Sequence, residues 1–313
     1  MSSRPVVDVV TRDERGWYFI AAGRELRVFD ERGNIVKSIS ADTVGSSDYR
    51  AIVSVVSTGG GTMQVFDAQL QRVTLLSPTL TVTDRVRLPV IPLQDVVLLD
   101  SIGWVLNADS RTTDRIGLPL HMVDRNGKWK RSFGSTTASY RPGTEAWPML
   151  RKVADAGGGR LWMAHLKKYV VELWDTGGTK HKELVRHVPW FRAWQKYSGF
   201  FPDVKPHPII RDIRQDREGR LWVVIAVPDE RWSEALTPVK YPDGTEGYEP
   251  QDWNSVFDTV IEVLEPATGR LIVSRRFPQF MRKMIDERHL FSDAAIRDGG
   301  AALDVWHVTL VMQ

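Results

Sequence analysis

The side chains best suited to acid–base chemistry are two histidines, an arginine and an aspartate in the second half of the chain. His165 stands in "WMAHLKKY", His207 precedes an apolar run, and Arg211 and Asp212 lie at the start of that run. An imidazole can move a proton near neutral pH, and a guanidinium can hold an anion. These four residues form a candidate polar pocket, with hydrogen bonds that stabilise loops as the alternative and more common role.

No longer motif connects these residues to a reaction. The histidines never take the spacing H-E-x-x-H, and the chain lacks G-x-S-x-G, P-loop and dinucleotide-binding glycine patterns. Cysteine is absent, which excludes thiolate metal sites, cysteine nucleophiles and disulfides. The sequence therefore predicts no catalytic residue, no metal and no cofactor. Catalytic groups spread over several strands would leave no local motif, so an enzyme stays open as an alternative.

A second group of side chains suits binding. The stretch "VPWFRAWQKYSGFFP", residues 188–202, contains six aromatic rings in a chain that is 10% aromatic. Four rings recur at i, i+4, i+7 and i+11, which predicts a short helix with one aromatic side. They are Trp190, Trp194, Tyr197 and Phe201. Such rings can anchor the loop itself, contact a partner or cover a small-molecule pocket, and anchoring is the most common of the three roles.

Charge and hydropathy argue against nucleic-acid binding and against a membrane-spanning segment. The chain has 42 basic and 39 acidic side chains, which are interspersed, whereas a nucleic-acid-binding protein concentrates its basic residues. No apolar run approaches the roughly 18 residues that span a bilayer. The N-terminus "MSSRPVVDVV" lacks a signal peptide, which predicts a cytoplasmic protein as the chain stands. An exported domain whose signal had been removed would look the same.

A repeated unit sets the fold that must position these side chains. Hairpins such as "VFDERGNIVKSI", "MVDRNGKWKRSFG" and "LWDTGGTKHKELVR" each follow a second hairpin such as "ADAGGGRLWMA" or "QDREGRLWVV". Repeats of about 40–50 residues with four strands are typical of propeller blades. The sequence predicts a single all-β propeller over residues 1–313, with six four-stranded blades and five as the alternative count. Short helices are expected only in the links between blades.

The blade pattern "D-x-x-G-R-L-W-V" followed by "V-F-D-x-x-G" resembles bacterial six-bladed propellers of the NHL, TolB-like and strictosidine-synthase-like group. This resemblance implies the fold. The group includes lactonases, esterases, lyases and binding modules, so it implies no single activity. Its calcium-dependent lactonases hold the metal with Asp, Asn and Glu, and no such set can be aligned in this sequence.

The long insertions are expected on one face of the propeller, because links between blades and loops between second and third strands share that face. Residues 187–208 form the link between blades 4 and 5, and residues 227–255 an insertion in blade 5. The third and fourth segments are "GSTTASYRPGTEAWP" and the link "PQFMRKMIDERHLF", whose "MRKMIDER" is predicted to be helical. The last blade is expected to start at "IRDGGAALDVWHV" and to borrow a strand from the N-terminus or remain thin.

The gathered aromatic residues favour a non-catalytic binding or scaffold propeller that engages a protein partner, including one in a membrane-associated complex. The predicted partner-binding residues are Trp190, Phe191, Trp194, Tyr197, Phe200, Phe201, Trp232 and Trp253. The alternative is a hydrolase or lyase with a pocket at the top of the central channel, formed by His165, His207 and Arg211.

Overall fold

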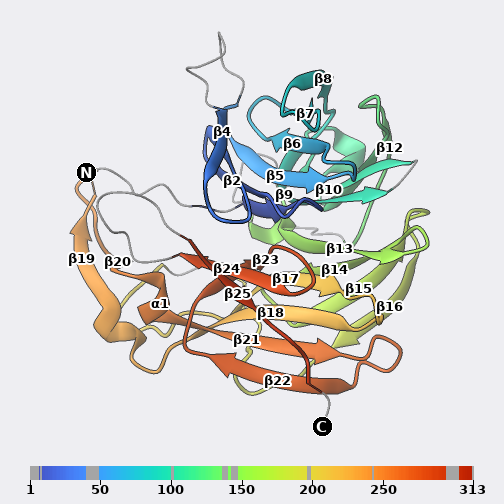
Figure 1. The fold of residues 1–313 in the computed structure, drawn as a ribbon. Coiled ribbons are helices and arrows are strands. Elements are labelled where there is room, and N and C mark those ends of the chain that lie inside the picture. Colours follow the sequence, from blue (N-terminus) through green and yellow to red (C-terminus); the bar gives the residue numbers. More distant parts are fainter. Residues whose placement is uncertain are drawn as a thin grey trace. The chain divides into compact units, whose positions relative to one another are not determined.

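The computed structural model describes residues 7, 9–39, 49–99, 102–135, 140–141, 147–195, 199–241, 243–293 and 303–311. Six successive sheets account for most of them (Figure 1). The first five sheets have four strands each, and the sixth has three described strands. The all-β class and the six-bladed propeller fold predicted from the repeat are therefore confirmed.

The strands follow the order of the chain within each blade. Blade 1 contains β1 (Val9–Arg12), β2 (Tyr18–Ala22), β3 (Glu25–Phe29) and β4 (Ile35–Ile39). Blade 2 contains β5 (Ile52–Ser57), β6 (Met63–Asp67), β7 (Arg72–Leu76) and β8 (Val82–Arg87). Blade 3 contains β9 (Ile91–Leu99), β10 (Gly103–Asp109), β11 (Leu120–Val123) and β12 (Trp129–Phe133).

The remaining blades carry the longer insertions. Blade 4 contains β13 (Arg151–Gly157), β14 (Arg160–His165), β15 (Val170–Asp175) and β16 (Lys180–Val185). Blade 5 contains β17 (Ile209–Gln215), β18 (Leu221–Pro228), β21 (Phe257–Leu264) and β22 (Leu271–Phe277). Blade 6 contains β23 (Met281–Met284), β24 (His289–Asp293) and β25 (Leu303–His307). The N-terminal residues 1–6, from which blade 6 is predicted to borrow a strand or else remain thin, lie outside the described residues.

The helical turns are short and lie in connections. The 3-10 turn η2 (Trp147–Met149) lies in the link between blades 3 and 4. Three others lie between the second and third strands of a blade, where helices were not expected: η1 (Thr113–Arg115), η3 (Trp232–Ala235) and α1 (Trp253–Val256).

The predicted Asp–Gly turns close the hairpins between third and fourth strands. In blade 1, Asp30 Oδ1 accepts hydrogen bonds from the backbone N–H groups of Arg32 and Asn34, at 2.9 and 2.8 Å. Gly33 has a φ of +83°, a conformation that glycine adopts without steric cost. Asp124 makes the same pair of bonds in blade 3. The repeated aspartates are therefore structural, as the sequence indicated.

The chain forms two compact units. The first consists mainly of Met1–Trp162 and Leu173–His181. Its core includes Phe19, Leu26, Phe66 and Trp104, which are fully buried. The first strands β1, β5, β9 and β13 lie next to one another in this order. The second unit consists mainly of Met163–Glu172 and Lys182–Ile296, with the residues from Ala302 onward. It contains nearly all the candidate functional residues.

The start of blade 6 differs from the prediction. "MRKMIDER" is not a helix: Met281–Met284 form β23, which pairs with β24. Met281 and Met284 are buried against Trp222 and Ile261 of blade 5, so packing of the sheets decides the conformation. The segment predicted to be a link is therefore the first hairpin of blade 6. Leu303–His307, assigned to that hairpin from the sequence, form the third strand.

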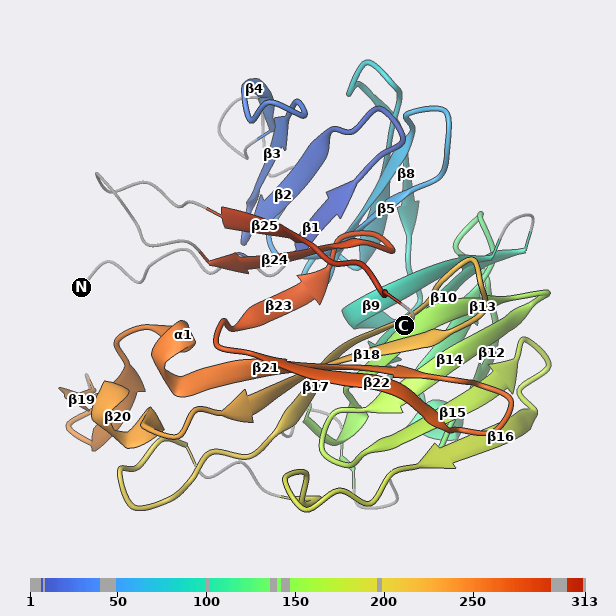
Figure 2. The same cartoon turned by 60° about the horizontal axis from the view of Figure 1, so that its bottom comes forward.

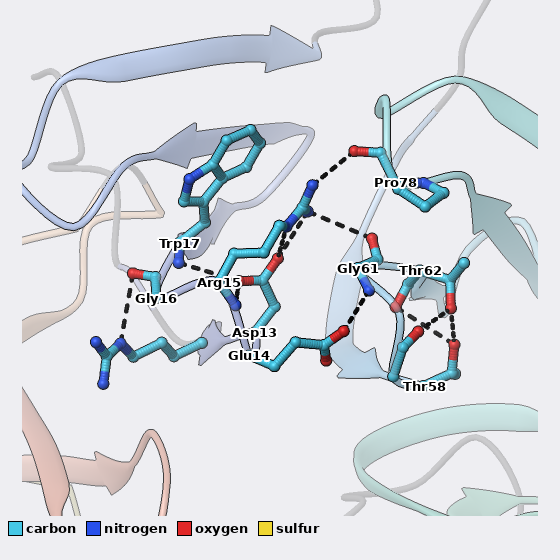
Figure 3. A network of polar contacts seen from close by, with 11 residues as sticks. Asp13, Glu14, Arg15, Gly16, Trp17, Thr58, Gly61, Thr62 and Pro78 are labelled. Atoms are coloured by element: carbon cyan, nitrogen blue, oxygen red, sulfur yellow. Dashed lines mark hydrogen bonds and ion pairs between the residues drawn. The ribbon is translucent and has the colours of Figure 1, made fainter.

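A polar network ties blade 1 to blade 2 in the first unit, and Figure 3 shows Arg15 at its centre. The Arg15 side chain donates to Asp13 Oδ2 at 2.7 Å and to the carbonyl oxygens of Pro78 and Gly61, at 2.7 and 3.3 Å. The Gly61 N–H in turn donates to Glu14 Oε1 at 2.6 Å. One arginine thus joins the first hairpin of blade 1 to two turns of blade 2.

Gly61→Ala is expected to lower the free energy of unfolding by about 2 kcal/mol. Gly61 has a φ of +74°, and an added Cβ would lie 3.0 Å from Arg15 Cζ, so the guanidinium would have to leave its carbonyl partners. Gly60→Ala is a matched control, because Gly60 has a φ of +60° and open space around it. Urea denaturation should show a larger loss for Gly61→Ala. Equal losses would mean that the Arg15 network contributes no stability.

Candidate functional site

The link at 187–208 does not form the predicted helix in its described residues. The Trp194 backbone N–H donates to the Lys167 carbonyl of the β14–β15 corner at 3.1 Å, and its ring N–H donates to the Pro208 carbonyl at the end of the same link at 2.9 Å. The backbone bond takes the place of the i→i−4 bond that a helix needs, which overrides the helical spacing of the rings. Tyr197, assigned to the same aromatic side, lies outside the described residues.

The link packs its first rings on the corner of blade 4. Tyr169 lies 5.4 Å from Phe191 and 6.4 Å from Trp190, measured between ring centroids. Further along, the Trp194 ring stacks on His207 at 5.0 Å, with Lys167 Nζ 4.7 Å from its centroid on the indole. The first half of the link is therefore held down by aromatic contacts.

The second half of the link meets the insertion of blade 5. In that insertion η3 is followed by a hairpin of β19 (Leu236–Lys240) and β20 (Glu246–Pro250), and then by α1. Figure 2 shows α1, β19 and β20 together at one end of β18 and β21. Phe200 forms a β-bridge with Tyr248, and its ring contacts Trp253 at 5.7 Å. The two insertions thus contact each other in the second unit.

We call the rings at this meeting point the aromatic loop cluster. Trp253 stacks on Phe257 at 6.0 Å and on Phe280 at 5.8 Å. The cluster consists of Phe200, Trp232, Tyr248, Trp253, Phe257 and Phe280. It joins the link, the insertion and the segment before β23 into one small core.

The exposure of the rings separates anchors from surface residues. Phe191, Trp194 and Trp232 are buried, and Phe200 and Trp253 are half-buried. Trp190 is 38% exposed and Phe201 is 40% exposed. The buried rings therefore pack within the loops, whereas Trp190 and Phe201 remain at the surface, and partner binding by these residues stays a prediction.

The four residues of the candidate polar pocket make the following contacts. His165 and Glu172 are both buried, with His165 Nε2 3.7 Å from Glu172 Oε1. His207 stacks on Trp194, and burial lowers the pKa of its imidazole. Arg211 Cζ lies 5.4 Å from the Phe280 ring centroid. Asp212 is buried and accepts the Met284 backbone N–H at 2.8 Å. These contacts involve loops and strands of the second unit, and a shared polar pocket of the four residues stays a prediction.

A groove that the sequence did not reveal lies beside Trp190. Its volume is about 650 Å³, and it runs between the β14–β15 corner, the end of β16 and the link. We call it the basic groove, and its main lining residues are Lys168, Tyr169, Arg186, His187, Phe191 and Arg192. Its lining residues come from two separate stretches of the chain, residues 168–170 and 185–193, so no single sequence motif contains them.

A buried carboxylate supports the wall of the basic groove. Glu262 of β21 is almost fully buried and accepts the Tyr169 hydroxyl hydrogen bond at 2.6 Å. Its carboxylate also pairs with Arg186, whose Nε lies 2.7 Å from Oε2 and whose Nη2 lies 3.2 Å from Oε1. Burial and the neighbouring Glu262 carboxylate raise the pKa of Tyr169 well above its usual value. Tyr169 is therefore a permanent hydrogen-bond donor at neutral pH.

Two features concern the described residues as a whole. They contain no group of three or more His, Asp or Glu side chains arranged to hold a metal ion. None of their helices is long and apolar enough to cross a membrane.

The fold resembles several solved propellers. A member of the DUF4221 family from Bacteroides vulgatus is 12% identical, with 98% of this chain and 94% of that chain covered and a TM-score of 0.61. Virginiamycin B lyase from Staphylococcus aureus is 9% identical, with 93% of this chain and 92% of that chain covered and a TM-score of 0.51. A luciferin-regenerating enzyme is 12% identical, with 97% of this chain and 92% of that chain covered and a TM-score of 0.52. No family model and no curated protein matches the sequence. At these identities the likeness shows the fold alone.

Proposed function

We propose that the chain is a binding propeller that engages a protein partner through the loops of its second unit. The partner surface is centred on Trp190 and Phe201, and its partner is a protein, including one that belongs to a membrane-associated complex. Of the buried rings named from the sequence, Phe191 packs directly against Trp190, with 6.2 Å between ring centroids.

The observation that carries the proposal is the exposure of Trp190. Its ring rests on Tyr169 and Phe191, yet 38% of the residue stays in contact with water. A tryptophan on a packed base loses little conformational entropy on binding and buries a large apolar area, which is why such residues dominate interface energetics. Phe201 lies on the same link as Trp190, is exposed and contacts Tyr248 of the insertion, and we include it in the proposed surface.

An enzyme is the less supported alternative. Lyase and luciferin-regenerating activities occur among proteins with a similar fold, which makes propeller chemistry of this kind a legitimate candidate. A reaction at the predicted pocket would need His165, His207 and Arg211 to face one substrate. Their contacts with Glu172, Trp194 and Phe280 do not favour that arrangement.

The double variant Trp190→Ser/Phe201→Ser is expected to lose the partner while it keeps the fold. Both side chains are exposed, so the unfolding midpoint should change little, whereas loss of two interface rings should weaken binding on the order of a hundredfold. The measurement is quantitative mass spectrometry of proteins that co-purify with the native chain and with the variant from cells that naturally contain it.

Ile35→Ser provides the matched control, because Ile35 is an exposed apolar residue of blade 1. A partner recovered by the native chain and by Ile35→Ser, and lost by the double variant, supports the proposal. Equal recovery by all three chains would contradict it. Loss of the folded state in the double variant would instead assign both rings to the core.

A further inference from the structure

The basic groove has an excess of positive charge. Lys168, Arg186 and Arg192 line it, together with the exposed His187. No aspartate or glutamate lines the described part of the groove. Glu262 neutralises the charge of Arg186, so the net positive charge of the groove comes from Lys168 and Arg192. Within the described chain neither of them forms an ion pair, so both are available to an anion.

Arg186 and Tyr169, which form one wall of the groove, are held in place by several contacts. Arg186 is held by two contacts to Glu262, and its guanidinium lies 5.6 Å from the Tyr169 ring centroid. Its backbone N–H donates to the Tyr169 carbonyl at 3.1 Å, which fixes the end of β16 to the β14–β15 corner. A site held in place before binding loses less entropy when its ligand arrives.

The groove also offers apolar surface next to its cations. Phe191 and Pro189 line it, and Trp190 packs against Phe191 with 6.2 Å between ring centroids. A ligand that fits both features carries carboxylates alternating with aromatic or aliphatic groups. The exposed polar side chains Lys168, His187 and Arg192 line an open groove, which suits an extended peptide.

On these grounds we infer that the basic groove binds an acidic segment of the partner protein, with the carboxylates on Lys168 and Arg192 and an apolar side chain against the exposed Pro189. This inference rests on the proposed function, because it assigns part of the same partner. The occupant is a peptide in which glutamate or aspartate alternates with leucine or phenylalanine. Arg186 and Tyr169 shape the wall, and Lys168 and Arg192 supply the charge that selects the ligand.

The test uses a fluorescein-labelled twelve-residue peptide of glutamates with interspersed leucine and phenylalanine, and fluorescence anisotropy with the full chain at low salt. The native chain is expected to bind it, and Lys168→Gln/Arg192→Gln is expected to bind on the order of tenfold more weakly, because each exposed cation contributes a modest, salt-screened attraction. The matched control Arg24→Gln/Lys240→Gln removes two exposed cations that do not line the groove, and it should bind like the native chain.

Several results would overturn the inference. They are no binding of the peptide, equal binding by both double variants, and equal binding of a peptide with glutamine in place of glutamate. A labelled twelve-nucleotide oligouridylate that binds as tightly would point to phosphate, and N-acetylglutamate that competes at the affinity of the peptide would point to a small molecule. Either result contradicts an acidic protein segment.

Failure of this inference can be distinguished from failure of the proposed function. If Lys168→Gln/Arg192→Gln still recovers the cellular partner while Phe201→Ser loses it, partner binding stands and the groove assignment fails. If the peptide binds in the groove while no variant changes partner recovery, the proposed function fails.

Discussion

Replacing Glu262 with alanine is expected to lower the free energy of unfolding by about 3 kcal/mol, because it leaves the positive charge of Arg186 without its carboxylate partner. Arg186, whose side chain is 17% exposed, would lose both carboxylate contacts. The buried Tyr169 hydroxyl would lose its acceptor at the same time. A largely desolvated cation without its partner and an unsatisfied buried hydroxyl each oppose folding. Urea denaturation monitored by circular dichroism gives the unfolding free energy directly.

Glu262→Gln separates charge from shape in this network. The amide oxygen can still accept the Tyr169 hydrogen bond, so we expect a loss smaller than that of Glu262→Ala, about 1 to 2 kcal/mol. A double-mutant cycle with Tyr169→Phe measures the coupling between the two residues. Additive losses would show that Tyr169 and Glu262 stabilise the fold independently. A loss below about 1 kcal/mol for Glu262→Ala would contradict a buried, coupled network.

The sequence contained most of the fold because blade hairpins are local. Asp30 and Asp124 each bind backbone within four residues, so residue type and spacing are sufficient to predict the turns. The predicted start of blade 6 was wrong for the same reason. The first turn of this blade, "IDERH", lacks glycine, whereas "IRDGG" resembles the repeated turn, so the sequence placed the first hairpin too late in the chain. Burial of Met281 and Met284 against blade 5 is a tertiary effect with no local signal.

The candidate site was predictable only in part. The aromatic residues of the link and the insertion were expected to gather, and Phe200 and Tyr248 do pair. The helical spacing failed because Trp194 bonds to Lys167 and Pro208, which no periodicity reveals. The basic groove depends on Glu262, 76 positions from Arg186 in the sequence, and contact between neighbouring blades brings the two together. Such long-range pairs need a fold before they can be recognised.

His121 is expected to make the chain sensitive to mild acid. It is completely buried on β11, with Nδ1 2.7 Å from Ser132 Oγ, and burial lowers its pKa from 6.5 to about 4, with Arg115 as a smaller contribution. The folded state then binds fewer protons than the unfolded state between these two values. The stability is therefore complete above about pH 6.5 and is lost as the pH falls, until the loss levels off below about pH 4.

The size of this effect follows from the pKa difference. Each unit corresponds to about 1.4 kcal/mol, so the buried imidazole should cost the folded state about 2 to 3 kcal/mol by about pH 4.5. His121→Asn removes the titrating group, and comparing the two chains at each pH cancels the carboxylates that also titrate. We expect the native unfolding free energy to fall more steeply than that of the variant between about pH 7 and pH 4.5. Parallel curves would mean that His121 can be protonated without leaving its buried position, and the predicted pH dependence would be wrong.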